Sequence, residues 1–175
     1  MKRIAVVFLI CLNALLTQAF HIVGGEIEFV YIGDGIYRIN VIQYFDEAQE
    51  DNPGPEGAVE VSFFRSSDDV FLFSQILSFE TIEDVNYTNP ECTIDELATS
   101  RVVWTAELLL DPFEFDDPKG YYIVWERCCR NDDIKNIVNP DATGMTYVLD
   151  FPPLVRNGER FINSSPVLFQ PLLVC

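Results

Sequence analysis

The stretch at residues 120–131, Gly-Tyr-Tyr-Ile-Val-Trp-Glu-Arg-Cys-Cys-Arg-Asn, constrains the fold more than any other part of the chain. Its first part is rich in aromatic and β-branched residues, which favour the pleated, half-buried surface of a sheet. Successive side chains of a strand point to opposite faces, so the adjacent cysteines Cys128 and Cys129 are predicted to point in opposite directions and to have different partners. The more apolar face is expected to look into a core and comprises Tyr121, Ile123, Trp125 and Cys129.

The rest of the chain repeats this pattern of short strands and turns. A hairpin is predicted at 26–45, where Gly33-Asp34-Gly35 supplies turn residues that tolerate positive φ. No convincing amphipathic helix of ten residues or more is found, and there is no internal repeat. The pattern favours an all-β fold, an immunoglobulin-like antiparallel β-sandwich. The other predicted strands lie at 58–65, 70–76 with a possible extension to 82, 101–110, 146–151 and 167–174.

Composition limits the classes of partner. The chain has 175 residues, of which 49% are hydrophobic, enough for one well-buried domain. The formal net charge is −17 and the pI is about 4.1. Such a surface repels nucleic acid and anionic membranes, which are therefore excluded as expected partners, and it is compatible with cations or basic partners.

The N-terminus has the pattern of a secretion signal. Met1-Lys2-Arg3 is a basic start, residues 4–16 form an apolar run, and Ala19 offers a small residue for cleavage. The apolar run is too short to span a bilayer, so no membrane span is predicted. We expect export to the cell surface or medium, cleavage after Ala19, and a single β-sandwich domain at 20–175.

Four cysteines remain after the predicted cleavage: Cys92, Cys128, Cys129 and Cys175. An even number of cysteines in an exported chain favours a framework of two disulfides. A bridge between the adjacent cysteines would close a strained ring and is set aside, which leaves two connectivities. Because Cys129 shares the apolar face and Cys175 ends an apolar strand, Cys92–Cys128 with Cys129–Cys175 is favoured, and the reverse pairing remains open.

No pattern of catalytic residues is found, and the chain is predicted not to be an enzyme and to need no cofactor. The string Ile-Val-Gly-Gly at 22–25 is also how activated chymotrypsin-like proteases begin, but His21 is the only histidine and no nucleophile motif follows. The weak candidates for calcium ligands in an acidic loop, which follows no EF-hand pattern, are Asp111, Glu114, Asp116 and Asp117.

Several segments resemble one bacterial family. Glu-Arg-Cys-Cys-Arg-Asn at 126–131, His-Ile-Val-Gly-Gly-Glu at 21–26, the hairpin at 31–40 and Asn-Ser-Ser-Pro-Val at 163–167 resemble segments of the N-terminal module of large secreted surface proteins from gliding-type bacteria. Those proteins often carry PKD-like or immunoglobulin-like repeats. The resemblance implies that the chain is the first module of a longer protein and that it is associated with gliding motility or surface attachment.

Two functions are therefore expected. The first is a non-catalytic, secreted cell-surface module, adhesin-like or structural, whose partners are other domains of the same surface protein or an extracellular ligand. The alternative is a β-sandwich module that binds carbohydrate or protein. The alternative requires exposed aromatic side chains on one face, for which the candidates are Tyr87, Tyr121 and Tyr122.

Overall fold

The computed structural model describes residues 22–47, 55–85, 98–128, 130, 134–162 and 164–166. Their fold is all-β, with one short 3-10 helix, η3 (Pro140–Ala142). No helix in these residues is long and apolar enough to cross a membrane. The strands are β1 (Ile22–Gly33), β2 (Ile36–Asp46), β3 (Ala58–Arg65), β4 (Val70–Asp84), β5 (Thr99–Leu109), β6 (Tyr121–Arg127), β7 (Met145–Phe151), β8 (Val155–Arg156) and β9 (Glu159–Arg160).

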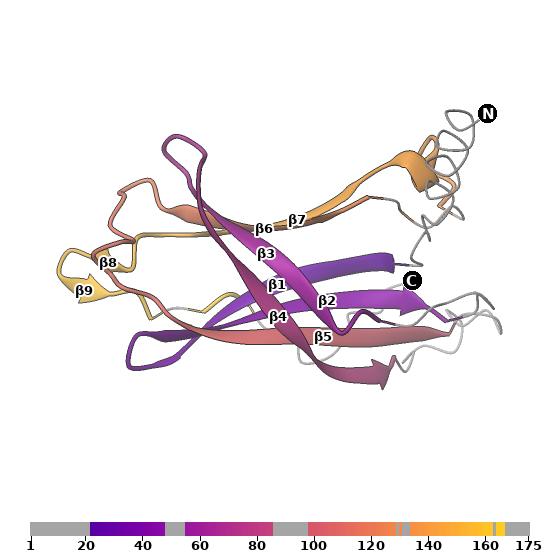
Figure 1. The fold of residues 1–175 in the computed structure, drawn as a ribbon, viewed down its shortest axis with the longest axis horizontal. Helices are drawn as coiled ribbons and strands as arrows, with labels where there is room; N and C mark the ends of the chain where they lie inside the picture. The colour runs from indigo at the N-terminus through magenta and orange to yellow at the C-terminus, as the bar shows by residue number, and fades with distance from the viewer. Residues whose placement is uncertain are drawn as a thin grey trace, which may run out of the picture.

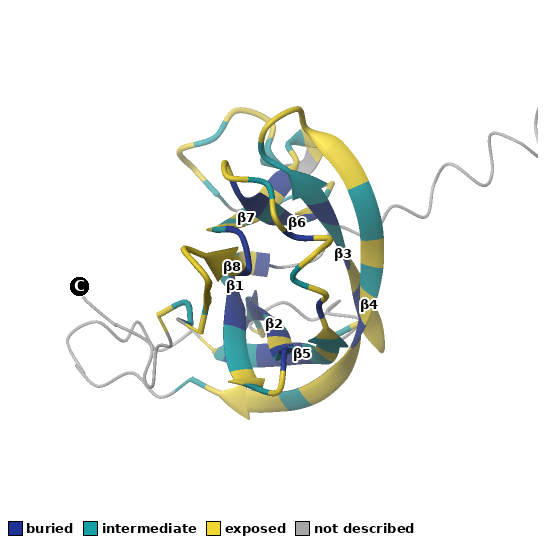
Figure 2. Cartoon of the chain, turned by 90° about the vertical axis from the view of Figure 1, so that its left-hand side faces the viewer, coloured by how far each residue is buried: buried dark blue, intermediate teal, exposed yellow. Residues whose placement is uncertain are grey.

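Seven strands form one antiparallel sheet in the order β1-β2-β5-β4-β3-β6-β7 (Figure 1). The sheet curls so far that its two edge strands, β1 and β7, come close together, and Figure 2 shows the resulting flattened, nearly closed barrel. The long strand β4 makes this curl possible, because its first half pairs with β3 and its second half with β5. Its register shifts between Phe79 and Thr81, where a bulge would let the strand bend from one side of the barrel to the other.

The interior of the barrel is rich in aromatic rings. Phe151 of β7 lies at its centre, with its ring centroid 4.8 Å from Phe29 of β1 and 5.6 Å from Tyr121 of β6. Phe29 also stacks on Tyr37 of β2 at 4.6 Å. The contact between Phe29 and Phe151 joins β1 and β7, the first and last strands of the sheet order, so side-chain packing there holds the curled sheet together.

Most strand predictions are confirmed. The turn between β1 and β2 has positive φ at Gly33, Asp34 and Gly35, and β3 has the predicted bounds. The face of Tyr121, Ile123 and Trp125 is buried, at 2%, 0% and 4% exposure. The region at 77–82 both extends β4 and contains the bulge.

Other features differ from the sequence-based expectation. Seven of the nine described strands form one continuous ladder, and not the two packed sheets of a sandwich. The antiparallel all-β class is therefore confirmed, and the immunoglobulin-like sandwich stays a prediction. The small hairpin of β8 and β9 was not predicted, although its turn, Asn157-Gly158, is a common hairpin signal. The predicted signal segment at 1–19 and the predicted strand at 167–174 lie outside the described residues.

Candidate functional site

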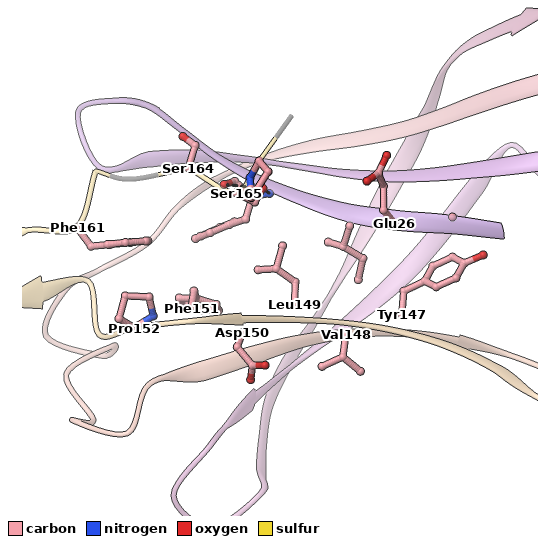
Figure 3. A pocket seen from close by; sticks show the side chains of 14 residues that line it. Glu26, Tyr147, Val148, Leu149, Asp150, Phe151, Pro152, Phe161, Ser164 and Ser165 are labelled. Atoms are coloured by element: carbon pink, nitrogen blue, oxygen red, sulfur yellow. Dashed lines mark hydrogen bonds between the residues drawn. The ribbon is translucent and has the colours of Figure 1, made fainter. Parts of the chain in front are cut away.

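A groove lies along the gap between the edge strands β1 and β7, and we call it the seam groove. It has a volume of about 760 Å³ and is lined by residues of β1, of β7 and of the segment 161–166. Figure 3 shows Tyr147 and Leu149 pointing from β7 toward β1, whereas Val148 and Asp150 point away. The seam groove therefore opens onto the inner, mostly apolar face of the sheet.

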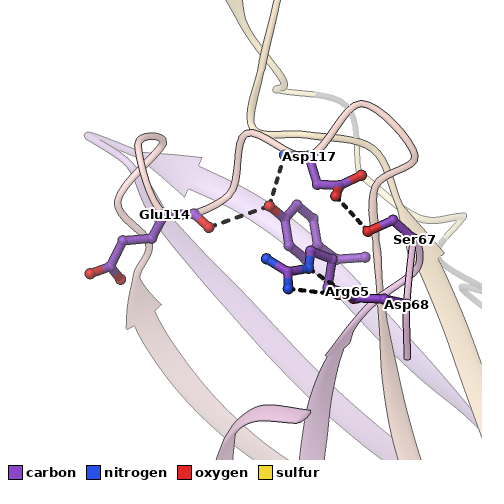
Figure 4. Close-up of polar contacts among 6 residues, drawn as sticks. Arg65, Ser67, Asp68, Glu114 and Asp117 are labelled. Atoms are coloured by element: carbon purple, nitrogen blue, oxygen red, sulfur yellow. Dashed lines mark hydrogen bonds and ion pairs between the residues drawn. The ribbon is translucent and has the colours of Figure 1, made fainter. Parts of the chain in front are cut away.

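At one end of the barrel, a cluster of polar groups connects the loop before β6 with Tyr121 and Ser67 (Figure 4). The Tyr121 hydroxyl, at the buried end of its side chain, accepts a hydrogen bond from the Asp117 N–H at 2.9 Å and donates one to the Glu114 carbonyl at 3.3 Å. The Asp117 carboxylate accepts hydrogen bonds from the Ser67 hydroxyl at 2.6 Å and from the Lys119 N–H at 2.8 Å. These bonds, led by the one from Ser67, hold the pKa of Asp117 below its usual value.

The predicted calcium candidates lie in this same loop. The Asp111 carboxylate accepts a hydrogen bond from the Phe113 N–H at 2.9 Å, and the Asp117 carboxylate accepts the hydrogen bond from Ser67 given above. Both act as local loop caps. Among the described residues, no three histidine, cysteine or acidic side chains converge as a metal-binding group. Calcium binding by Asp111, Glu114, Asp116 and Asp117 stays a prediction.

Three aromatic side chains form a row on the outer surface of the sheet, opposite the core. Phe64 of β3 pairs with Phe71 of β4 on one side and with Tyr122 of β6 on the other. The Phe64 and Tyr122 rings stack with centroids 5.1 Å apart and planes 11° apart, and the Phe71 ring meets Phe64 edge-on at 5.7 Å. We call Phe64, Phe71 and Tyr122 the outer aromatic row.

A second groove, of about 800 Å³, contains this row. Beside the aromatics, the next cross-strand positions are Ser74, Ser62 and Val124. The Ser74 hydroxyl donates a hydrogen bond to the Glu60 carboxylate, and the Tyr122 hydroxyl donates one to Asp69 at 3.1 Å. The outer groove thus combines one exposed and two partly buried aromatic rings with hydroxyls and carboxylates.

The three predicted aromatic contacts have different outcomes. Tyr122 lies in the outer groove, as the binding hypothesis requires. The suggestion that Tyr121 is exposed is wrong, because strand alternation turns it into the core, where it is 2% exposed. Tyr87 lies outside the described residues. Sequence reasoning did not single out Phe64 or Phe71, whose cross-strand neighbours become known only once the register is known.

Of the four cysteines in the predicted framework, Cys128 lies within the described residues. Cys128 follows the last residue of β6 and is disulfide-bonded. The connection that contains Cys92 leaves and re-enters the sheet at this same end, where the Val85 N–H donates to the Thr99 carbonyl at 2.8 Å. Cys92, Cys129 and Cys175 lie outside the described residues, so the predicted pairing is not tested.

The fold and these surfaces define an all-β, nearly barrel-like scaffold with an outward aromatic groove. Neither a family model, nor a curated protein, nor a solved structure matches this chain.

Proposed function

We propose that this chain is a non-catalytic, secreted cell-surface module that attaches to an extracellular ligand through its outer aromatic row. The observation that carries the proposal is the alignment of Phe64, Phe71 and Tyr122 across three adjacent strands of the sheet. Phe71 is 54% exposed although it is a large hydrophobic side chain. Exposed aromatics grouped on one surface are typical of interaction sites.

The chemistry of the outer groove favours carbohydrate as the ligand class. A sugar ring presents C–H groups that pack against aromatic faces, and its hydroxyls need hydrogen-bonding groups beside them. The row supplies the ring faces, and Ser62, Glu60 and Asp69 lie close enough to supply hydroxyl and carboxylate groups. A protein ligand with basic side chains is the second candidate, because the formal net charge of −17 would favour its approach.

Export, the cell-surface location and the association with gliding motility belong to the same proposal. They rest on the N-terminal signal pattern and on the resemblance of the four motif segments to the bacterial surface family. In this proposal the barrel-like sheet acts as an immunoglobulin-like sandwich module, stabilised by two disulfides, at the start of a longer protein.

A binding experiment tests the proposal. The mature chain, starting at Phe20, is applied to a glycan array, and hits are measured again with the variants Phe64→Ala and Tyr122→Ala. We expect each substitution to weaken binding about tenfold or more, because stacking on an aromatic ring contributes roughly 1–3 kcal/mol where a ligand ring is involved.

Leu109→Ala is the matched control, because Leu109 is an apolar side chain, 75% exposed, on β5, away from the outer groove. Its binding should equal that of the unmodified chain. Glycan binding that survives both aromatic substitutions would contradict the role of the row. Binding of a basic protein, and of no glycan, that depends on the row would select the second candidate.

A further inference from the structure

The outer groove has acidic side chains at the end opposite its rings. The outer aromatic row crosses one end of the groove. On the same face of the sheet, the next residues along β3 and β6 are Ser62 and Val124, and beyond them lie the exposed acids Glu60 and Glu126. Four strand residues span about 13 Å. An oligosaccharide, and not a single sugar ring, can therefore reach from the rings to these acids.

A second pair of exposed acids lies beside the outer aromatic row itself. The Tyr122 hydroxyl donates a hydrogen bond to Asp69 at 3.1 Å, and Asp150 of β7 stands directly opposite Tyr122. Figure 3 shows Asp150 pointing away from β1, which places it on the outer surface with Tyr122. Burial first, and then the hydrogen bond to Asp69 and the charges of both acids, raise the pKa of the Tyr122 hydroxyl. The negative field of the two carboxylates thus reaches the tyrosine side chain.

The positive side chains of these strands are already paired with other carboxylates. The strands β3, β4 and β6 contain two arginines and no lysine. The Arg127 guanidinium donates to the Glu56 carboxylate at 2.9 Å. Arg65 donates two hydrogen bonds to the Asp68 carboxylate, at 2.9 and 2.8 Å. Because acids also outnumber arginine among the described residues that line the outer groove, its surface carries an excess of negative charge.

We infer that the outer groove selects glycans that carry protonated amines, an inference that rests on the proposed function. A cation close to the face of a phenylalanine or tyrosine ring is attracted by the ring. The carboxylates beside the rings and at the far end of the groove attract the same cation. An oligomer with an amine on every sugar presents a cation to both groups of acids, whichever of its sugars lies on the rings.

The residues between the rings and the acids favour an amino sugar over a basic peptide. Ser62 and Ser74 stand opposite each other on β3 and β4, and a serine hydroxyl can both donate and accept hydrogen bonds. Sugar hydroxyls can pair with these groups, whereas the apolar stem of a lysine or arginine side chain cannot. The groove thus has rings for the C–H faces of a sugar, hydroxyls for its hydroxyls and carboxylates for its amine.

A matched pair of ligands tests this selectivity. The β-1,4-linked glucosamine hexamer and cellohexaose share one backbone and differ at carbon 2, where an amine replaces a hydroxyl. Calorimetric titration of the mature chain near pH 6, where these amines are protonated, should show about fivefold or more tighter binding of the glucosamine hexamer in about 0.1 M salt. The difference should fall below about twofold in about 1 M salt, because the screening length falls from about 10 Å to about 3 Å.

Two substitutions remove charge from the groove and keep an acceptor oxygen. Asp69→Asn retains an acceptor for the Tyr122 hydroxyl, and asparagine tolerates the left-handed backbone at this position, where φ is 57°. Glu60→Gln retains an acceptor for the Ser74 hydroxyl. Each variant should lower the ratio of the two affinities by about twofold. The matched control is Glu107→Gln, which removes one charge from β5, outside the groove, and should leave the ratio unchanged.

The outcomes separate this inference from the proposed function. Equal affinities for the two hexamers, lost in Phe64→Ala and Tyr122→Ala, would overturn the selectivity for amines and leave the proposed function standing. Failure of both hexamers to bind would also overturn it, and the glycan array would then decide the proposed function alone. An advantage of the glucosamine hexamer that persists in about 1 M salt would show that charge is not its cause. Tighter binding of a lysine hexamer would overturn the inference in favour of a basic peptide.

Discussion

The inner and outer faces of β3 and β6 carry aromatic side chains on the same strands but use them differently. On the inner face Phe63 and Tyr121 are buried, at 0% and 2% exposure, against rings of β4 and β7. On the outer face lie Phe64 and Tyr122, one residue further along each strand, where the Phe64 ring stacks on Tyr122 and meets Phe71 edge-on. A shift of one position decides whether a ring stabilises the fold or is available to a ligand.

The largest expected effect breaks the inner side of this comparison. Phe151→Ala removes the ring that contacts Phe29, Phe63, Phe115 and Tyr121. Large-to-small changes of a buried phenylalanine cost about 3–5 kcal/mol, so denaturant unfolding should show a loss of that size. The same deletion on the outer face, Phe71→Ala, should cost less than about 1 kcal/mol. Comparable losses for the two variants would mean that the outer row is structural.

The two adjacent tyrosines provide the next comparison. Tyr121→Phe removes the hydroxyl that accepts from the Asp117 N–H and donates to the Glu114 carbonyl. A donor left without its partner costs about 1–3 kcal/mol, so the free energy of unfolding should fall by roughly 1–2 kcal/mol. Tyr122→Phe removes only an exposed bond to Asp69 and should leave the unfolding curve unchanged. A larger loss for Tyr122→Phe would contradict this assignment of the two faces.

The sequence predicted the core face of β6 but did not predict the outer aromatic row. The period of two in Tyr121, Ile123 and Trp125 was enough to find the core face of β6, because burial follows from local alternation. The outer aromatic row depends on which strands are neighbours and in which register. Phe71 meets Phe64 only because the register of β3 and β4 shifts after Phe63, and no pattern within either strand encodes that shift.

The barrel-like closure also exceeds what local patterns can show. Whether a sheet remains two layers or curls into one ladder depends on where a long strand changes partners. In β4 that point lies near Ser78, which pairs with Ala58 on one side and Thr105 on the other. The sequence suggested either an extension or a bulge after Ile76, and both occur.

Substituting Phe64, the central ring of the outer aromatic row, measures how much the stacking within the row contributes to the free energy of unfolding. Phe64→Leu keeps an apolar side chain of similar reach and removes the aromatic stack with Tyr122. An aromatic pair contributes about 0.5–1.5 kcal/mol beyond its buried area, so a loss of up to about 1 kcal/mol is expected in chemical denaturation, smaller than for Phe151→Ala. An increase in stability would show that the row is strained in the absence of ligand.

The smallest effect concerns the outer face of β1, which carries acids where β3 and β6 carry rings. Burial and, second, the neighbouring Glu28 raise the pKa of Glu26 above its usual value, and Arg101 partly opposes them. The folded state therefore favours the protonated carboxyl group of Glu26. Protonation of Glu26 stabilises the fold fully below about pH 4.5, and this stabilisation is lost as the pH rises through the pKa of Glu26 in the folded state. Glu26→Gln should raise stability at pH 7 by less than about 1 kcal/mol, and the gain should vanish near pH 3.5.

Glu107→Gln, which breaks an exposed ion pair with Arg38 at 2.7 Å, is the control and should give no gain at pH 7. Thermal unfolding at the two pH values measures both, and a gain for Glu26→Gln that persists at low pH would show that its cause is not the charge.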